Sequence, residues 1–400
     1  MIDRSNGFLH TGNRLTLFRW LLCAAFIGGI LFSIQLWFPT YRSFPRAPVL
    51  FAPPEASMLP AEWFLSTILV VALILTMVSK RPALFSVLAL IPLGLLVAFD
   101  QSRLQPWVYQ YSLLLGVLAL HDWRTKDVAV SNRTLSLLQL TVAAVYFWSG
   151  LQKLNFTFFH EILPALLDPL LIALPWLPQP ASGVGIFVAL TEILIGCGLL
   201  YPRTRDLFVW LAVTMHGIAL ALLIARGYNS VVWIWNCALM LVVIILFRRS
   251  DIYFWRPSRI SEGLKGKLAI AVTLSAALLP LLSFLGWWDM YLSGALYSGN
   301  TAVGVVKVDR EVSAQLPATA KEQLFSVETT GEEMLPLVEW SMADLNVPVY
   351  PEVRVYQEVT SEICKLATNK TEVALIVKER PAIFSGQYKV TQTSCARLER

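Results

Sequence analysis

Three ionisable side chains interrupt long apolar stretches and are the first candidates for chemistry. Lys153 ends the stretch YFWSGLQKLNF (146–156), Glu192 lies in LTEILIGCGLL (190–200), and His216 lies in VTMHGIALAL (213–222). A charged side chain at the centre of a membrane helix costs at least ~2.5–3.5 kcal/mol on insertion scales. Each of the three therefore needs a structural or a functional reason to be there.

Three interpretations fit Lys153. It could be an anchor that reaches the headgroups, a member of a structural ion pair, or a catalytic base. Ser149 and Gly150 just before it are small and allow a neighbouring helix to come close. The segment that follows looks re-entrant, which would bury the amine. Both features favour the ion pair or the base over the anchor.

Glu192 and His216 are predicted to lie at similar depth on neighbouring antiparallel helices. A short turn at 202–206 joins the two helices, and each residue lies about ten positions from that turn. At ~1.5 Å rise per residue, the two side chains come level. Two interpretations remain open, a structural hydrogen bond between helices and a proton-handling or metal-binding pair. We name Lys153, Glu192 and His216 as the candidate catalytic residues and predict no metal site.

Composition places the chain among membrane proteins. Of its 400 residues 56% are hydrophobic and only 15% are charged, against ~25% charged in a typical soluble protein. The first apolar run begins near Leu15 and continues past Trp37, too long for a signal-peptide core of ~7–15 residues. Nine candidate spans follow: 15–38, 60–79, 83–99, 105–120, 134–152, 183–201, 206–224, 229–247 and 267–287. The sequence therefore predicts an all-α polytopic bundle.

Charge sets the expected orientation. With the N-terminus in the cytoplasm, 16 of the 21 Lys and Arg residues before position 300 fall on the cytoplasmic side. This is the bias that orients membrane proteins, so it accounts for the basic surplus better than nucleic-acid binding does. Nine spans then place the C-terminal part outside the cytoplasm.

The proline-rich stretch 156–182 is apolar but carries His160, Glu161 and Asp168. A full span here would put the basic turn after it on the wrong side. We therefore expect a re-entrant or interfacial helix on the outer face, since irregular backbone at membrane depth must be buried in protein or line a cavity.

The chain divides into a transmembrane domain, 1–288, and an extracytoplasmic α+β tail domain, 289–400. Strands are expected at 352–359, 372–378 and 387–395, where valine-rich runs alternate with polar residues, and a helix at 320–327. Cys364 and Cys395 are the only cysteines of the tail. An oxidising compartment would favour a disulfide between them, although two buried free thiols would also fit.

The stretch around Lys153, followed by TEILIGCGLLYPRTRDLFVWLAVTMHGIAL and NSVVWIWNCALM, resembles the transmembrane domain of vitamin K-dependent gamma-glutamyl carboxylases, and the DoxX-like membrane proteins are a neighbouring match. The resemblance covers roughly residues 15–290. It implies a bacterial plasma-membrane protein in which Lys153 is the base that deprotonates a quinol, with His216 matching a later histidine. The family's histidine before the lysine has no counterpart in 100–115, so the resemblance does not extend to glutamate carboxylation.

Three functions follow. The first is a membrane enzyme that uses Lys153, supported by Glu192 and His216, on a lipid-soluble, quinol-like substrate at the outer leaflet. The second is a non-catalytic scaffold whose tail binds a protein partner. The third, a transporter, is disfavoured because the sequence lacks the inverted repeats common in transporters. Membrane lipid is the expected surrounding in all three, and a quinone is the one cofactor that the resemblance implies.

Overall fold

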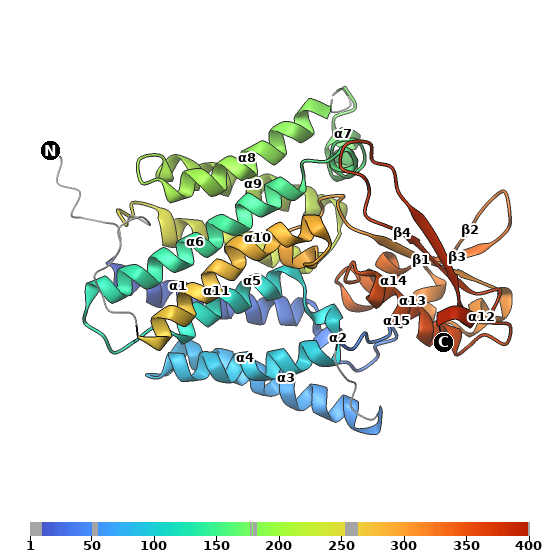
Figure 1. Cartoon of the computed structure of the whole chain (residues 1–400), viewed down its shortest axis with the longest axis horizontal. Coiled ribbons are helices and arrows are strands. Elements are labelled where there is room, and N and C mark those ends of the chain that lie inside the picture. Colours follow the sequence, from blue (N-terminus) through green and yellow to red (C-terminus); the bar gives the residue numbers. More distant parts are fainter. Residues whose placement is uncertain (1–9, 50–54, 177, 179–181, 253–262, 399–400) are drawn as a thin grey trace.

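Eight helices are long and apolar enough to cross a membrane, and they gather into one bundle (Figure 1). The computed structural model describes residues 10–49, 55–176, 178, 182–252 and 263–398, and the count of eight refers to these residues. The helices are α1 (Thr11–Phe32), α3 (Glu55–Val78), α4 (Pro82–Phe99), α6 (Val128–Gln152), α8 (Ser182–Leu200), α9 (Arg205–Arg226), α10 (Ser230–Phe247) and α11 (Leu264–Leu278), which continues as the 3-10 helix η3 (Leu279–Leu285). Each overlaps a predicted span, so the prediction of several membrane-length apolar helices is confirmed.

The remaining predicted span, 105–120, forms a shorter helix. This helix, α5 (Pro106–Ala119), has 14 residues and a length of ~21 Å, against ~30 Å of hydrocarbon. It packs against α1, α4, α6 and α11 inside the bundle. Gln105 before it donates to the Pro348 carbonyl of the tail, whereas Trp123 after it lies against Arg19 of α1. The helix thus leads from the tail end of the bundle to the other end, and its role as a ninth span stays a prediction.

The stretch 156–182 forms short helices. A π-helix, η2 (Phe158–Ile162), runs into α7 (Leu163–Ala173), and residues 177 and 179–181 lie outside the described part. The η2 turn packs on α8 and α7 packs on α9. A Cβ atom at Gly185 of α8 would lie 2.6 Å from the Phe159 ring, so glycine is required for this contact. Eleven residues of α7 are too few to cross a membrane.

Basic residues gather at the bundle end away from the tail. Arg14 donates to the carbonyl oxygens of Ile245 and Arg248, and Arg205 donates to that of Ser250. These bonds fasten the ends of α1, α9 and α10 together. Arg4, Arg256 and Arg259, which also contribute to the predicted basic side, lie outside the described residues.

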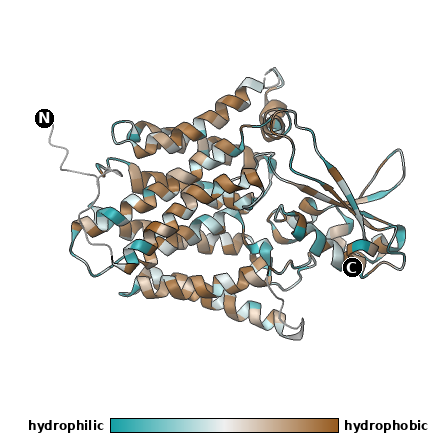
Figure 2. Ribbon diagram, in the orientation of Figure 1, coloured by the Kyte–Doolittle hydropathy of each residue, from teal (hydrophilic) through white to brown (hydrophobic). Residues whose placement is uncertain are grey.

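The tail is a small α+β unit. Its antiparallel sheet has the order β2-β3-β1-β4-β5. The strands are β1 (Val303–Val308), β2 (Phe325–Ser326), β3 (Glu333–Pro336), β4 (Ala374–Lys378) and β5 (Val390–Ser394); the helices are α12 (Arg310–Gln315), α13 (Ala318–Lys321), α14 (Leu337–Leu345), α15 (Val353–Cys364) and α16 (Cys395–Leu398). In the central strand Val306 pairs with Leu335 on one side and Leu375 on the other, and all three are buried. The ribbon of the tail carries more hydrophilic residues than that of the bundle helices (Figure 2).

Two of the predicted strands are confirmed, and one is wrong. The segments 372–378 and 387–395 contain β4 and β5. The segment 352–359 belongs to helix α15, because Val355, Val359 and Ile363 recur every four residues and are buried together. The expected helix at 320–327 is also wrong, since α13 ends at Lys321 and the chain turns into β2. Strand β1 was not anticipated.

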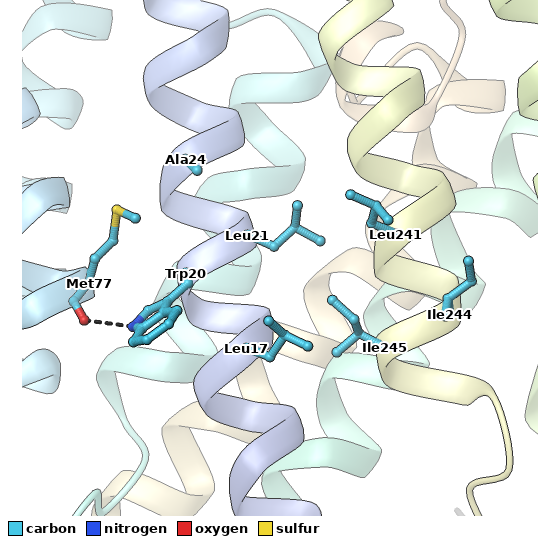
Figure 3. A pocket seen from close by; sticks show the side chains of 8 residues that line it. All are labelled: Leu17, Trp20, Leu21, Ala24, Met77, Leu241, Ile244 and Ile245. Atoms are coloured by element: carbon cyan, nitrogen blue, oxygen red, sulfur yellow. Dashed lines mark hydrogen bonds between the residues drawn. The ribbon is translucent and has the colours of Figure 1, made fainter. Parts of the chain in front are cut away.

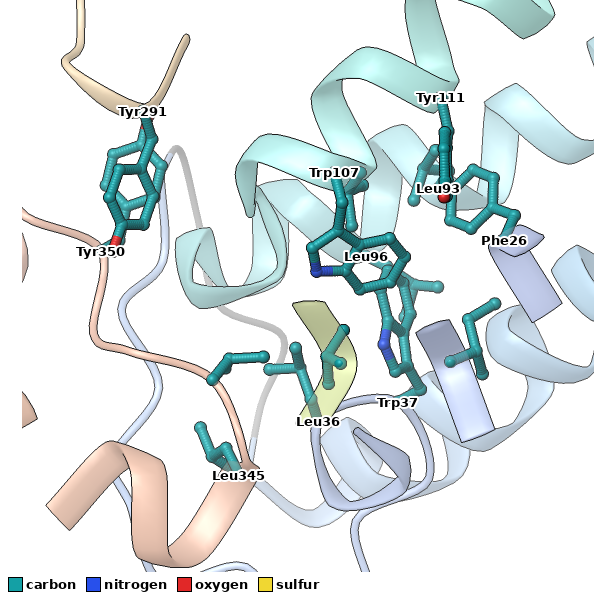
Figure 4. Packing of buried hydrophobic residues seen from close by; sticks show 14 of the residues in the cluster. Phe26, Leu36, Trp37, Leu93, Leu96, Trp107, Tyr111, Tyr291, Leu345 and Tyr350 are labelled. Atoms are coloured by element: carbon teal, nitrogen blue, oxygen red, sulfur yellow. The ribbon is translucent and has the colours of Figure 1, made fainter. Parts of the chain in front are cut away.

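Hydrogen bonds between polar groups fasten the tail to the bundle. The Asp344 carboxylate accepts hydrogen bonds from the backbone N–H groups of Ser43 and Phe44, at 2.9 and 2.8 Å. Asn346 donates to the Phe32 carbonyl and to Ser230 Oγ, both at 2.7 Å. The apolar core also continues across this junction, from Trp107 and Trp37 in the bundle to Leu345 in the tail (Figure 4).

Candidate functional site

Lys153 and Glu192 form an ion pair across the contact between α6 and α8. Lys153 caps the C-terminus of α6, and its Nζ atom lies 2.8 Å from Glu192 Oε2 and 2.7 Å from Ser149 Oγ. The two charged side chains are only 10% and 11% exposed. The amine is therefore held by a carboxylate inside the bundle and is not extended away from the protein.

Glycines at two levels allow α6 and α8 to approach closely enough for this pair. A Cβ atom at Gly150 would lie 2.7 Å from both Ala189 O and Ile193 N, and one at Gly196 would lie 2.7 Å from Ala143 O. Contacts this short are not tolerated, so only glycine fits at either position. Small residues at helix contacts are the usual means by which membrane helices come into backbone contact.

His216 has different partners from the predicted one. Its Nε2 atom lies 2.6 Å from the Tyr146 hydroxyl of α6, and its Nδ1 atom lies 2.8 Å from Asn236 Oδ1 of α10. The expected direct bond between Glu192 and His216 is not formed, because Glu192 is turned toward Lys153. A prediction of similar depth along two helices does not decide which side chains face each other.

The bonds around His216 fit a neutral imidazole. Asn236 donates through Nδ2 to the Val232 carbonyl, so its Oδ1 atom is the group that faces the ring and accepts. The hydrogen then lies on Nδ1 of His216, and Nε2 accepts from the Tyr146 hydroxyl. Both ring nitrogens of the buried His216 thus have hydrogen-bond partners, Asn236 for Nδ1 and Tyr146 for Nε2.

The Lys153–Glu192 pair and the group of His216, Tyr146 and Asn236 lie side by side and form one constellation. Tyr146, Ser149 and Lys153 are spaced by three and four residues and so lie along one face of α6. Glu192 and Lys153 lie within electrostatic range of His216, although no hydrogen bond joins them to it. The three predicted site residues are therefore brought together, with Tyr146 and Asn236 as members that sequence reasoning missed. Neither tyrosine nor asparagine stands out in an apolar helix until its partner is known.

The first residues of the tail close the C-terminal end of α6 beside Lys153. Asn300 donates to Gln152 Oε1 at 2.7 Å, and Asn155 donates to the Ser298 carbonyl at 2.8 Å. All four residues are buried. The covering chain fixes the end of α6, and with it the position of the lysine.

The ionisable residues of the stretch 156–182 do not join this constellation. His160 is exposed and stacks on Phe156, with ring centroids 3.9 Å apart, and Glu161 and Asp168 are exposed as well. Within the described part of the chain, no hydrogen bond or ion pair of these three reaches Lys153, Glu192 or His216.

A second buried charge cluster lies where the bundle meets the tail. Glu62 binds Arg103 at 2.5 Å and Arg46 at 2.7 Å, and Arg42 binds Asp100 at 2.6 Å. Burial opposes ionisation of Asp100, but the neighbouring arginines outweigh it and hold the pKa of the Asp100 carboxyl below its usual value. Each carboxylate of the cluster is paired with arginine, and Arg42 and Arg46 hold the 42–47 loop in place, so the role of the cluster is structural.

An apolar groove of about 460 Å³ opens between α1, α3 and α10 (Figure 3). Its walls include Leu17, Trp20, Leu21, Met77, Leu241 and Ile245. None of Lys153, Glu192 and His216 lines it, so it is separate from the constellation described above. Among the described residues, no three His, Cys, Asp or Glu side chains are grouped so as to hold a metal ion.

No family model, no curated protein and no solved structure matches this chain.

Proposed function

We propose that the protein is a polytopic plasma-membrane enzyme with a carboxylase-like core, and that the Lys153–Glu192 pair handles the proton of a lipid-soluble, quinol-like hydroxyl compound. Nine passes, with α5 as the short one, would place the tail outside the cytoplasm. The clustering of basic residues at the opposite end of the bundle supports this orientation.

One observation carries the proposal: three ionisable residues, Lys153, Glu192 and His216, lie near one another inside an apolar bundle, in two hydrogen-bonded groups that share one face of α6. Ionisable groups at membrane depth mark proton or substrate pathways more often than they serve packing alone. The Lys153–Glu192 pair lies next to the small residues of α6. It already holds an acid, the ammonium group, in contact with a base, the carboxylate.

The ion pair changes the role expected for the lysine. An incoming hydroxyl would give its proton to the Glu192 carboxylate, and the Lys153 ammonium would then pair with the resulting oxyanion. The proton stays in the site as the carboxylic acid, and the negative charge passes to the substrate oxygen. Both groups are needed, since one accepts the proton and the other stabilises the anion.

Binding of decylubiquinol to the purified protein in nanodiscs tests this proposal. Deprotonation shifts quinol absorption to longer wavelength, so the wild-type protein should show a red-shifted bound species. Lys153→Met should lose that species, whereas Lys389→Met, which removes a 74% exposed lysine of the tail, should keep it. A wild-type protein that binds no quinol would overturn the proposal.

A non-catalytic membrane scaffold is the second candidate, and a specific observation favours it. The Lys153 amine already bonds Ser149 and Glu192, and close glycine packing surrounds the pair. Under this function the pair locks α6 to α8, and the tail carries the activity by binding a protein partner. Normal function of Lys153→Met combined with Glu192→Leu would select this candidate over the enzyme.

A further inference from the structure

The apolar groove between α1, α3 and α10 has the shape and the surroundings of a lipid site. Its lining is hydrophobic throughout, and its volume of about 460 Å³ lies within the ~300–1,000 Å³ of small-molecule sites. Leu17 and Trp20 of α1 and Leu241 of α10 are 41–49% exposed along it. The groove therefore opens sideways, toward the surrounding lipid.

The groove is preformed, because side chains tie its three helices together at one end. The Met77 carbonyl of α3 accepts from Trp20 Nε1 at 2.8 Å (Figure 3) and from Arg19 at 3.1 Å. Arg14 of α1 donates to the Ile245 carbonyl of α10 at 2.9 Å. A ligand would enter a groove whose walls are already held in place, so little ordering would oppose binding.

Exposed cations stand at that same end. Lys80 and Arg81 follow the last turn of α3, three and four residues beyond Met77, and Arg249 follows the end of α10, four residues beyond Ile245. All three side chains are exposed. Asp206 and Asp251 lie at this end too, and Asp206 accepts from the Arg249 backbone N–H. Arg14, Arg19 and Arg248 add to the three exposed cations, so positively charged side chains outnumber the two carboxylates at this end.

The bulky walls favour a flexible chain over a partner helix. Helices pack against each other through stripes of small residues, whereas six leucine, isoleucine or tryptophan side chains and one methionine surround Ala24, the one alanine of this groove. An acyl chain can follow such an uneven surface. A phosphate at the cationic end would complete the match, as basic clusters beside membrane helices bind anionic lipid headgroups.

We propose that this groove is a binding site for one anionic phospholipid, with an acyl chain between α1 and α10 and the phosphate near Lys80, Arg81 and Arg249. The proposal is independent of the Lys153–Glu192 constellation, and either could fail without the other.

The purified protein in detergent, titrated with phosphatidylglycerol or phosphatidylcholine and observed by native mass spectrometry, tests it. Wild type should bind phosphatidylglycerol in preference to phosphatidylcholine. The combined variant K80Q, R81Q and R249Q should lose affinity for phosphatidylglycerol by about five-fold per cation removed. The matched control K126Q, K265Q and K267Q removes three exposed basic residues elsewhere and should keep wild-type affinity.

The apolar half of the site is tested separately. Ala24→Phe fills the groove and should weaken both lipids about ten-fold or more. The control Ala221→Phe makes the same change at an exposed alanine of α9 and should bind both lipids as wild type does. Equal binding of the two lipids by wild type, or unchanged binding by Ala24→Phe, overturns the proposal. So does a dimer that Ala24→Phe abolishes, because a second copy would then occupy the groove.

Discussion

The Lys153 Nζ atom and the Glu192 Oε2 atom lie 2.8 Å apart across the α6–α8 contact, inside a bundle of otherwise apolar helices. Two opposite charges here cost less than either one alone, since each removes most of the desolvation penalty of the other. The same closeness makes the pair a unit in any proton transfer. Its energetics and its chemistry are therefore linked.

Removing one member of the pair should cost more than removing both. Lys153→Met leaves a buried carboxylate without its partner and should lower the free energy of unfolding by about 3–5 kcal/mol. Adding Glu192→Leu should recover most of that loss, because an apolar contact replaces the pair. Thermal unfolding of the single and double variants in the same detergent measures the coupling.

The control for this cycle is the exposed pair Lys389–Glu379 on the tail. Lys389→Met should change stability by less than about 1 kcal/mol, as exposed pairs contribute little. Strictly additive effects of Lys153→Met and Glu192→Leu would contradict the coupling that the structure requires.

Gly150 should be intolerant of even a methyl group. Its Cβ position lies 2.7 Å from the Ala189 carbonyl oxygen, so Gly150→Ala must push α6 and α8 apart and should destabilise the protein by about 1–3 kcal/mol. Gly217→Ala on α9 meets nothing within 4 Å and should be neutral or stabilising. A thermal shift assay on both variants distinguishes them, and equal melting temperatures would argue against backbone contact at Gly150.

From the sequence alone, the only site residues that could be predicted are those that are unusual in an apolar helix whatever their partner. Lys153, Glu192 and His216 stand out because a charge or an imidazole in an apolar run is visible without a partner. Tyr146 and Asn236 became recognisable only through their bonds to His216. The choice of Lys153 over His216 as the partner of Glu192 depends on helix rotation, which sequence spacing along two separate helices does not determine.

The fold, too, could be predicted only in part. Apolar runs locate the long helices because burial in lipid demands about twenty apolar residues in a row. In the tail, the run Val353, Arg354, Val355 alternates like a strand, yet the apolar positions 355, 359 and 363 form a helix face. A short segment can fit both the two-residue period of a strand and the 3.6-residue period of a helix. Here packing against the sheet that covers α15 favours the helix.

The disulfide between Cys364 and Cys395 should stabilise the tail. It joins the end of α15 to the start of α16 over a separation of 31 residues, with the Cα atoms 5.6 Å apart. Cys364→Ser with Cys395→Ser should lower tail stability by about 2–4 kcal/mol, since the open loop gains freedom on unfolding. Urea unfolding followed by tail fluorescence measures the change.

The exposed cysteines of the bundle provide the control for that measurement. Cys197→Ser and Cys237→Ser remove free thiols and should leave the tail transition in place. A reducing agent should reproduce the effect of the double serine variant in the wild-type protein. Insensitivity of the tail transition to reduction would show that the bond carries no stability.

Glu352 should make the tail junction less stable as pH rises. Its carboxyl accepts from the Met290 backbone N–H and faces Asp289, Arg354 and Arg380; burial, then the Asp289 charge, raises its pKa above the usual value. A raised carboxyl pKa means that the folded state binds the proton more tightly than the unfolded state. The stabilising contribution is complete below the unfolded pKa of about 4.3 and is lost as pH rises through the folded pKa.

Glu352→Gln keeps an oxygen for the Met290 N–H but cannot ionise. It should therefore be more stable than wild type at neutral pH and should match it at the acid end of the titration. Glu362→Gln, at an exposed position of helix α15, which begins directly after Glu352, serves as the control and should retain the wild-type pH profile. Melting temperatures recorded from pH 4 to pH 8 decide the matter, because a Glu352→Gln profile parallel to that of wild type would assign the pH dependence to other groups.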